Sequence, residues 1–455
     1  MNLKKLTTTA TLALILLVNP AYSKNSGIKS TLSLETFQRL NDPQQKTSTT
    51  EWVGASLKGK SKLFHLDSAL DTDLRVYLND DKDINFSIAE AYVESSNGYD
   101  KSISVGRKLL DWNINEHYWM LGNMNGLQGM QLLSEKQEGL IGLHAERTFD
   151  TNFKVSIFFS YFNIPALNPG LDVKDGKITS NSEWVRRPPE YTVVKGKLVP
   201  IRYDINMPGY DKLVLKKSLG IRQSYKWEDG EISSFFIYKP ENKVRVNAEA
   251  KLVEENGGYF VDVTANPIVN HHMIYGVQLR QDFGDVKTIT GFDITDPNAR
   301  LGKDFDVLDP VKLEEAQRTY KSEYFDVAPN YDRESYFHST AYINRDTYDL
   351  LFGYIQILSD NIRGSDDFYS ETVKWKQAFG GKIRYFFSDD LQLSADIKYD
   401  ISRKDQIVKA EVFYRFMNSA AIKVGAELIK SPQDNSYWSA YRAHDTIYSN
   451  LSYTF

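Results

Sequence analysis

The chain has 455 residues and a nearly balanced charge, with 55 Lys and Arg against 60 Asp and Glu, which argues against a nucleic-acid partner. It contains no cysteine, and this excludes disulfide scaffolds, cysteine-ligated metals and thiol catalysis. The mean hydropathy is -0.45, and beyond the N-terminal segment no run of about 18 apolar residues predicts a transmembrane helix.

The N-terminal segment has the three parts of a secretory signal peptide. A positive start at Lys4 and Lys5 is followed by a short apolar core and by Ala21-Tyr22-Ser23, a cleavage site with small residues at its first and third positions. The apolar core is too short for an anchor helix that would span a membrane. We therefore predict a signal peptide over residues 1–23 and a single domain over residues 24–455.

Beyond this segment, apolar and polar residues alternate with a period of two, which indicates β-strands. In residues 391–401, leucine, alanine, isoleucine and tyrosine alternate with polar residues. Strands of about 9 to 12 residues match the tilted strands that cross a membrane. We predict strands at 28–40, 50–58, 61–78, 84–95, 101–108, 138–147, 152–163, 213–227, 231–239, 243–253, 257–267, 271–282, 286–296, 333–344, 347–358, 374–387, 390–401, 404–416, 419–430 and 445–455.

The longest connections between these strands lie at 109–137, 164–212, 297–332 and 359–373. If the first strand runs outward from the periplasm, all of these connections fall on the outer side, and the periplasmic connections are tight turns. Outer-membrane barrels have this asymmetry. The sequence therefore predicts an all-β fold, a transmembrane antiparallel β-barrel of about 18 strands, within a range of roughly 16 to 20.

The chain ends in an aromatic strand, with Tyr453 and the terminal Phe455. This end resembles the C-terminal signature by which the insertion machinery recognises the barrels of Gram-negative bacteria. The alternative is an edge strand of a soluble sandwich, but an exposed flat edge invites aggregation. Closure into a barrel removes that edge.

Charged residues that alternate with apolar ones should line the lumen of such a barrel, because the outer face meets lipid. Both signs occur on neighbouring strands. Such residues either form ladders that hold the wall in shape or set the field that a solute meets. The predicted lining residues are Glu90, Glu94, Arg107, Lys216, Arg222, Lys226, Lys382, Arg384, Asp396, Lys398, Lys409, Glu411 and Arg415.

The stretch Glu90-Ala91-Tyr92-Val93-Glu94, followed by Val105-Gly106-Arg107 and Trp112, resembles an early hairpin of porin-like barrels of the alginate-export and related substrate-specific type. The resemblance implies a substrate-specific channel. The chain departs from the pattern at Asn113, where a glycine is expected. By strand parity, Glu90 and Arg107 could face the same lumen and form an ion pair.

The connection after this hairpin, residues 109–137, is rich in aromatic side chains and weakly charged. Long loops without a strand pattern are usually functional or disordered, and disordered segments hold few aromatics. We therefore expect an ordered loop that folds inward and narrows the pore, or one that packs on a neighbouring subunit. The residues expected at the constriction are Trp112, His117, Tyr118 and Trp119.

Motifs of catalysis or metal binding are missing from the sequence. No HExxH, Gly-x-Ser-x-Gly, phosphate-binding loop or dinucleotide glycine pattern occurs. His271 and His272 open a strand with their rings on opposite faces, which is poor metal geometry. We expect no enzymatic activity, no cofactor and no metal.

The expected function is that of an outer-membrane porin for passive diffusion of small hydrophilic solutes in a Gram-negative bacterium. The expected partners are outer-membrane lipid, the barrel-insertion machinery and those solutes. The alternative is a non-conducting barrel with a structural or surface-interaction role, for which a homo-oligomeric assembly stays open.

Overall fold

The computed structural model describes residues 27–40, 49–63, 66–78, 84–97, 100–128, 133, 136–165, 172–179, 190–194, 197–242, 245–297, 324–327, 333–359, 373–433, 436–441 and 444–455. The proposed signal peptide lies outside this part of the chain. Within it, none of the helices combines the length and the apolar character needed to cross a bilayer.

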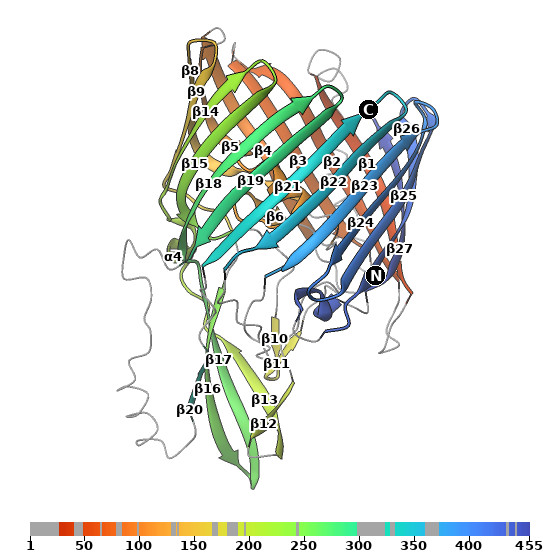
Figure 1. Cartoon of the computed structure of the whole chain (residues 1–455). Helices are drawn as coiled ribbons and strands as arrows, with labels where there is room; N and C mark the ends of the chain where they lie inside the picture. Colours follow the sequence, from red (N-terminus) through yellow and green to blue (C-terminus); the bar gives the residue numbers. More distant parts are fainter. Residues whose placement is uncertain are drawn as a thin grey trace.

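Among the described residues, eighteen strands form one antiparallel sheet that closes on itself (Figure 1). Closure is direct, because β1 pairs with β2 on one side and with β27 on the other. This confirms the predicted all-β barrel. The wall strands are β1 (Ile28–Arg39), β2 (Thr49–Leu63), β3 (Leu66–Tyr77), β4 (Ile84–Asn97), β5 (Lys101–Lys108), β8 (Leu140–Phe149), β9 (Phe153–Ser160), β14 (Ser218–Trp227), β15 (Gly230–Pro240), β18 (His271–Phe283), β19 (Val286–Asp296), β21 (Glu334–Asn344), β22 (Tyr348–Ile357), β23 (Gln377–Phe386), β24 (Leu391–Asp400), β25 (Asp405–Met417), β26 (Ala420–Lys430) and β27 (Thr446–Thr454).

Two of the predicted wall strands, 243–253 and 257–267, are wrong. They form the hairpin β16 (Arg245–Glu255) and β17 (Gly258–Ile268), which lies in the connection between β15 and β18 and belongs to a second sheet. The error has a physical reason. A strand with one buried face alternates with a period of two whether that face meets lipid or a small protein core.

The two rims of the barrel differ in the length of their connections. At one rim the strands are joined by two to four residues, as at 150–152 and 228–229. The longest connections all leave the other rim, as predicted. The connection 241–270 leaves the same rim. In Figure 1 the short turns lie at the top, beside the C-terminus, and the hairpin β16–β17 lies below the opposite rim.

The outer face of the wall is apolar and carries a band of exposed aromatic rings near the short-turn rim. Tyr453 and Phe455 belong to this band, with ring centroids 4.8 Å apart. Aromatic girdles of this kind mark the interface between lipid and water. The other exposed rings near this rim are Phe149, Tyr225, Phe283, Tyr385, Phe387, Tyr414 and Phe416.

A second sheet, here called the accessory sheet, projects from the rim of the long connections (Figure 1). Its order is β12-β13-β17-β16-β20, with β12 (Tyr191–Val194), β13 (Lys197–Ile205) and β20 (Tyr324–Val327), so three different connections contribute to it. The connection 164–212, for which no strand was predicted, supplies β12 and β13 together with the small hairpin β10 (Asp172–Lys174) and β11 (Lys177–Thr179).

The accessory sheet has its own apolar core and its own turn chemistry. Val199, Ile201 and Val263 are buried there, and Ile178 of β11 packs against them. The turn of the β16–β17 hairpin begins at Asn256-Gly257, where both residues have positive φ, as a two-residue hairpin turn requires. The sheet is therefore a small folded unit outside the wall.

Candidate functional site: the barrel lumen

The direction of the side chains on β23 identifies the inner face of the wall. Phe379 and Ile383 are exposed on the outer face. Because successive side chains of a strand point to opposite faces, Gly380, Lys382 and Arg384 face the lumen. Residues directly opposite each other in a sheet share a face. Lys382 lies opposite Asp396, Asp396 opposite Lys409, and Lys409 opposite Glu427, so this row of charges lies on the inner face.

Residues 109–128, here called the inward segment, fold into the barrel and dock their aromatic side chains on wall glycines. Tyr118 lies against Gly353 and Gly380, which are opposite each other on β22 and β23. Trp112 lies against Gly220 of β14, where a Cβ atom would come within 2.9 Å of the indole ring. Only glycine leaves room for a ring so close to the backbone.

Asn115 attaches the inward segment to the wall by three hydrogen bonds. Its Nδ2 donates to Ile289 O at 3.1 Å and to His338 Nδ1 at 2.8 Å, and its Oδ1 accepts from Thr340 Oγ1 at 2.6 Å. The carbonyl of Ile289 can only accept, which fixes the orientation of the Asn115 amide. His338 Nδ1 is consequently the acceptor, and its Nε2–H donates to Asp293.

Asn113 makes the neighbouring attachment. Its Nδ2 donates to Asp293 Oδ1 at 3.2 Å, and its Oδ1 accepts from Gln278 Nε2 at 2.6 Å. The residue that departs from the expected glycine is thus a hydrogen-bonded anchor. All of these groups are buried, so loss of one partner would leave another without a bond.

Three connections meet in an indole cluster beside the inward segment. Trp119, Trp375 and Trp438 are each completely buried, with centroid distances of 5.6 Å and 5.1 Å along the series. Trp375 Nε1 donates to Trp119 O at 2.7 Å, and Trp438 Nε1 donates to Lys374 O at 3.0 Å. The cluster binds the inward segment to the connections that precede β23 and β27.

The short helix α3 (Ile114–Trp119) of the inward segment has one face towards the wall and one towards the lumen. Asn115, Glu116 and Trp119 are buried against the wall, whereas Ile114 and His117 are exposed. Burial raises the pKa of Glu116 to about 8, although its Oε1 accepts a hydrogen bond from Met124 N at 2.6 Å. Helix α3 therefore offers an isoleucine and a histidine to the lumen.

Opposite charges pair along the inner face of the described wall. One of these charged residues, Lys398, lies over the ring of Tyr118, with Nζ 4.5 Å from the ring centroid, so the row of charges contacts the inward segment. The pairs on β24–β26 are Lys398–Asp396 (2.9 Å), Lys409–Glu427 (3.2 Å), Lys409–Glu411 (3.9 Å) and Lys423–Glu411 (3.1 Å).

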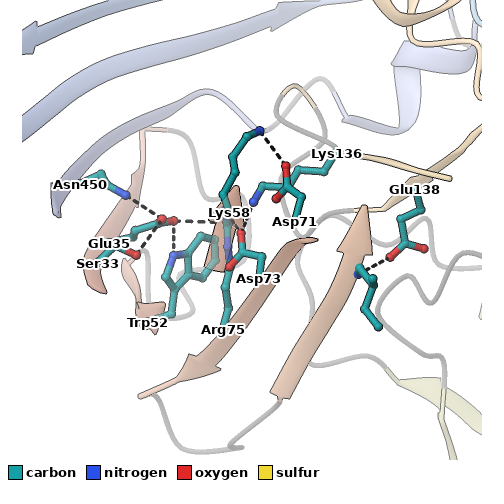
Figure 2. Close-up of polar contacts among 11 residues, drawn as sticks. Ser33, Glu35, Trp52, Lys58, Asp71, Asp73, Arg75, Lys136, Glu138 and Asn450 are labelled. Atoms are coloured by element: carbon teal, nitrogen blue, oxygen red, sulfur yellow. Dashed lines mark hydrogen bonds and ion pairs between the residues drawn. The ribbon is translucent and has the colours of Figure 1, made fainter. Parts of the chain in front are cut away.

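Figure 2 shows a second polar cluster where the first and last strands meet. Glu35 of β1 accepts from Trp52 Nε1 and from Asn450 Nδ2, the latter at 2.7 Å, and it lies 3.4 Å from Arg75 NH1. The carboxylate thereby joins β27, β1, β2 and β3. Asp73 extends the cluster by pairing with Arg75 at 3.3 Å and with Lys136, which follows the inward segment.

The structure pairs Arg107 with Glu138, at 3.3 Å, rather than with Glu90. Glu90 instead accepts from Leu109 N at 3.3 Å. Strand parity fails here because the β3–β4 register shifts between Asp71 and Thr72, and because Gly106 has a φ of +132°. Glu138 could not have been placed here from sequence spacing.

The remaining predicted lining residues lie in four settings. Glu94 pairs with Lys108 at 2.7 Å and Arg222 with Glu231 at 2.9 Å, both between neighbouring strands. Lys382 lies on the inner face, two residues from Gly380, on which Tyr118 docks, and Lys216 precedes β14 at the rim of the long connections. The predicted lining residues towards the short-turn rim are Lys226, Arg384 and Arg415. Arg384 pairs with Asp349 and Arg415 pairs with Asp390, each at 3.7 Å.

Solved structures with a similar fold are substrate-specific outer-membrane porins. OccAB3 of Acinetobacter baumannii has a TM-score of 0.47 and 10% identity, with 94% of this chain and 99% of that chain covered. OccK2 (OpdF) of Pseudomonas aeruginosa, solved in complex with glucuronate, has a TM-score of 0.48 and 10% identity, covering 94% and 98%.

No family model matches the chain, and no curated protein matches it. The function is therefore argued from the lumen itself.

Proposed function

We propose that the protein is an outer-membrane channel of the porin type, which lets small hydrophilic solutes diffuse passively. The observation that carries the proposal is the closed eighteen-stranded wall with a charged, ion-paired inner face. Barrels of about 16 to 18 strands are wide enough to leave an aqueous channel. Paired charges line such a channel with polar groups without imposing a large net field.

The inward segment supports the proposal because the wall holds it in a fixed position inside the barrel. Its contacts through Trp112, Asn115 and Tyr118 are with β14, β19 and β21–β24. Half-exposed charges such as Arg384 and Lys423 lie on other parts of the inner face. A segment held in this way narrows a pore and selects solutes by size and charge.

The proposed location is the outer membrane of a Gram-negative bacterium, after removal of residues 1–23. In that membrane the band containing Tyr453 and Phe455 would lie at the periplasmic interface, where these residues would serve as the signal for the insertion machinery. The accessory sheet would then face the outside of the cell.

Conductance of the purified, folded protein in a planar lipid bilayer tests the proposed function. We expect stepwise conductance increments that heat-denatured protein does not give. Folding is checked by the different gel mobility of boiled and unboiled samples. A folded barrel that never conducts would contradict the proposal.

A second function, in surface interaction, is favoured by one observation: three connections jointly build the accessory sheet outside the wall. Such a sheet has no evident role in diffusion. Binding of labelled protein to target cells, compared between the full chain and a variant without residues 243–268, tests this role. Equal binding by both proteins would contradict it. Native mass spectrometry of the same samples shows whether the barrel is a homo-oligomer.

A further inference from the structure

His117 is the titratable residue of α3 that faces the lumen. The helix buries Asn115, Glu116 and Trp119 against the wall and leaves His117 exposed. Its neighbour Tyr118 is fixed between Gly353 and Gly380, so the backbone of His117 has a defined position inside the barrel. The imidazole is therefore enclosed by the wall and still in contact with lumen water.

Two lysines of the wall lie close to α3: Lys398 Nζ is 4.5 Å from the ring centroid of Tyr118, and Lys382 shares the inner face of β23 with Gly380, on which Tyr118 docks. Burial within the barrel lowers the pKa of His117, and the ammonium groups of Lys382 on β23 and Lys398 on β24 lower it further. Asp111, on the same connection, acts in the opposite direction. Lys398 is neutralised in part by Asp396 at 2.9 Å.

Lys382 differs from Lys398 in its surroundings. It lies on the inner face directly opposite Asp396, but the carboxylate of Asp396 is engaged by both of its oxygens with Lys398 Nζ at 2.9 Å. Lys382 is thus a cation that acts on His117, and the carboxylate opposite it in the sheet is already bound to another lysine. A charge on His117 would add to this local excess of positive charge.

We propose that His117 sets the ion selectivity of the constriction and makes that selectivity depend on pH. This inference rests on the proposed channel function. At neutral pH the imidazole is uncharged, and the constriction presents Lys382 and the Lys398–Asp396 pair. Below the pKa of His117, which is lowered from the ordinary value of 6.5, a second cation stands beside Lys382. Small anions, inorganic or organic, are then favoured over cations.

The reversal potential across a bilayer with a KCl gradient tests this inference at pH 7 and at pH 5. We expect the chloride-to-potassium permeability ratio of the full chain to rise on acidification. One added charge about 4 Å from a permeating ion in water changes its occupancy about fivefold at low salt. The His117→Gln variant should lose most of this rise. The His117→Lys variant should show the low-pH ratio already at pH 7.

His144→Gln is the matched control. His144 also belongs to the inner face, but it is buried, and its ring lies 4.8 Å from that of Phe158. This variant should respond to pH as the full chain does. A purely structural role of His117 would change the conductance of His117→Gln equally at both pH values. A channel that conducts, but whose pH response persists in His117→Gln, would overturn the inference. A folded barrel without any conductance would instead refute the proposed function.

Discussion

Tyr118 occupies the space above Gly380, so that a Cβ atom at position 380 would overlap the phenol hydroxyl. The contact joins the inward segment to the middle of β23, close to the row of lumen charges. Beyond Gly380 on this strand, Lys382 and Arg384 carry long side chains on the same face and leave no such place for the ring. The docked position of the inward segment therefore depends on the glycine as much as on the tyrosine.

The Gly380→Val variant should displace Tyr118 and loosen the inward segment. We expect a folded barrel with larger or noisier single-channel conductance, because the aromatic ring can no longer dock. Gly381→Val is the matched control, since a Cβ atom there meets nothing within 4 Å and faces away from the lumen. Identical conductance traces for the two variants would show that Tyr118 does not shape the pore.

Glu35 should stabilise the closure of the barrel. The Glu35→Gln variant removes the charge that Arg75 faces and weakens the bonds from Trp52 and Asn450. Because Arg75 keeps Asp73 as a partner, we expect a loss of about 1 to 3 kcal/mol in the free energy of unfolding. The midpoint of urea unfolding, followed by gel mobility, measures it. Glu51→Gln, on the exposed face of β2, is the control and should leave the midpoint unchanged.

Glu116 should make the docking of the inward segment depend on pH. Burial raises its pKa from 4.5 to about 8 in the docked state, so the docked state favours the protonated acid. Docking is then strongest below pH 4.5 and weakens as the pH rises towards 8. The total change is a few kcal/mol, since each unit of pKa shift corresponds to about 1.4 kcal/mol.

Channel noise measured between pH 5 and pH 9 checks the Glu116 prediction. We expect current fluctuations to increase with pH in the full chain. The Glu116→Gln variant cannot ionise at this position and should give nearly constant noise over the range. Fluctuations that rise equally in both proteins would rule out Glu116 as their source.

Strand alternation predicted the barrel well because it records which face of each strand is apolar, as on β24 and β27. Alternation could not distinguish a strand whose apolar face meets lipid from one whose apolar face packs in a small protein core. It therefore placed β16 and β17 in the wall. Of the aromatic connection 109–137, residues 109–128 lie in the part that the structure describes, and they fold into the barrel. The attachment of this segment to Asp293 and His338 depends on contacts across 180 and 223 residues of sequence, and no local pattern carries that information.

Removal of the β16–β17 hairpin should leave the channel intact. Glu241 N donates to Asn270 O at 2.7 Å, so the two ends of this connection already meet at the rim. A variant in which a short glycine-serine turn replaces residues 243–268 keeps Asn242, which binds Gly122 O at 2.7 Å in the inward segment. We expect the variant to insert into membranes, to keep its heat-dependent gel mobility and to conduct like the full chain.

The matched control removes a hairpin of the wall itself, β23–β24, and should abolish folding because it opens the sheet. If loss of residues 243–268 also prevented folding, the hairpin would be part of the wall and the barrel would need more than eighteen strands. If the variant folded but ceased to conduct, the accessory sheet would be needed to keep the inward segment from blocking the pore. Normal conductance would confine the accessory sheet to a role outside the pore, where the surface-interaction function can be tested separately.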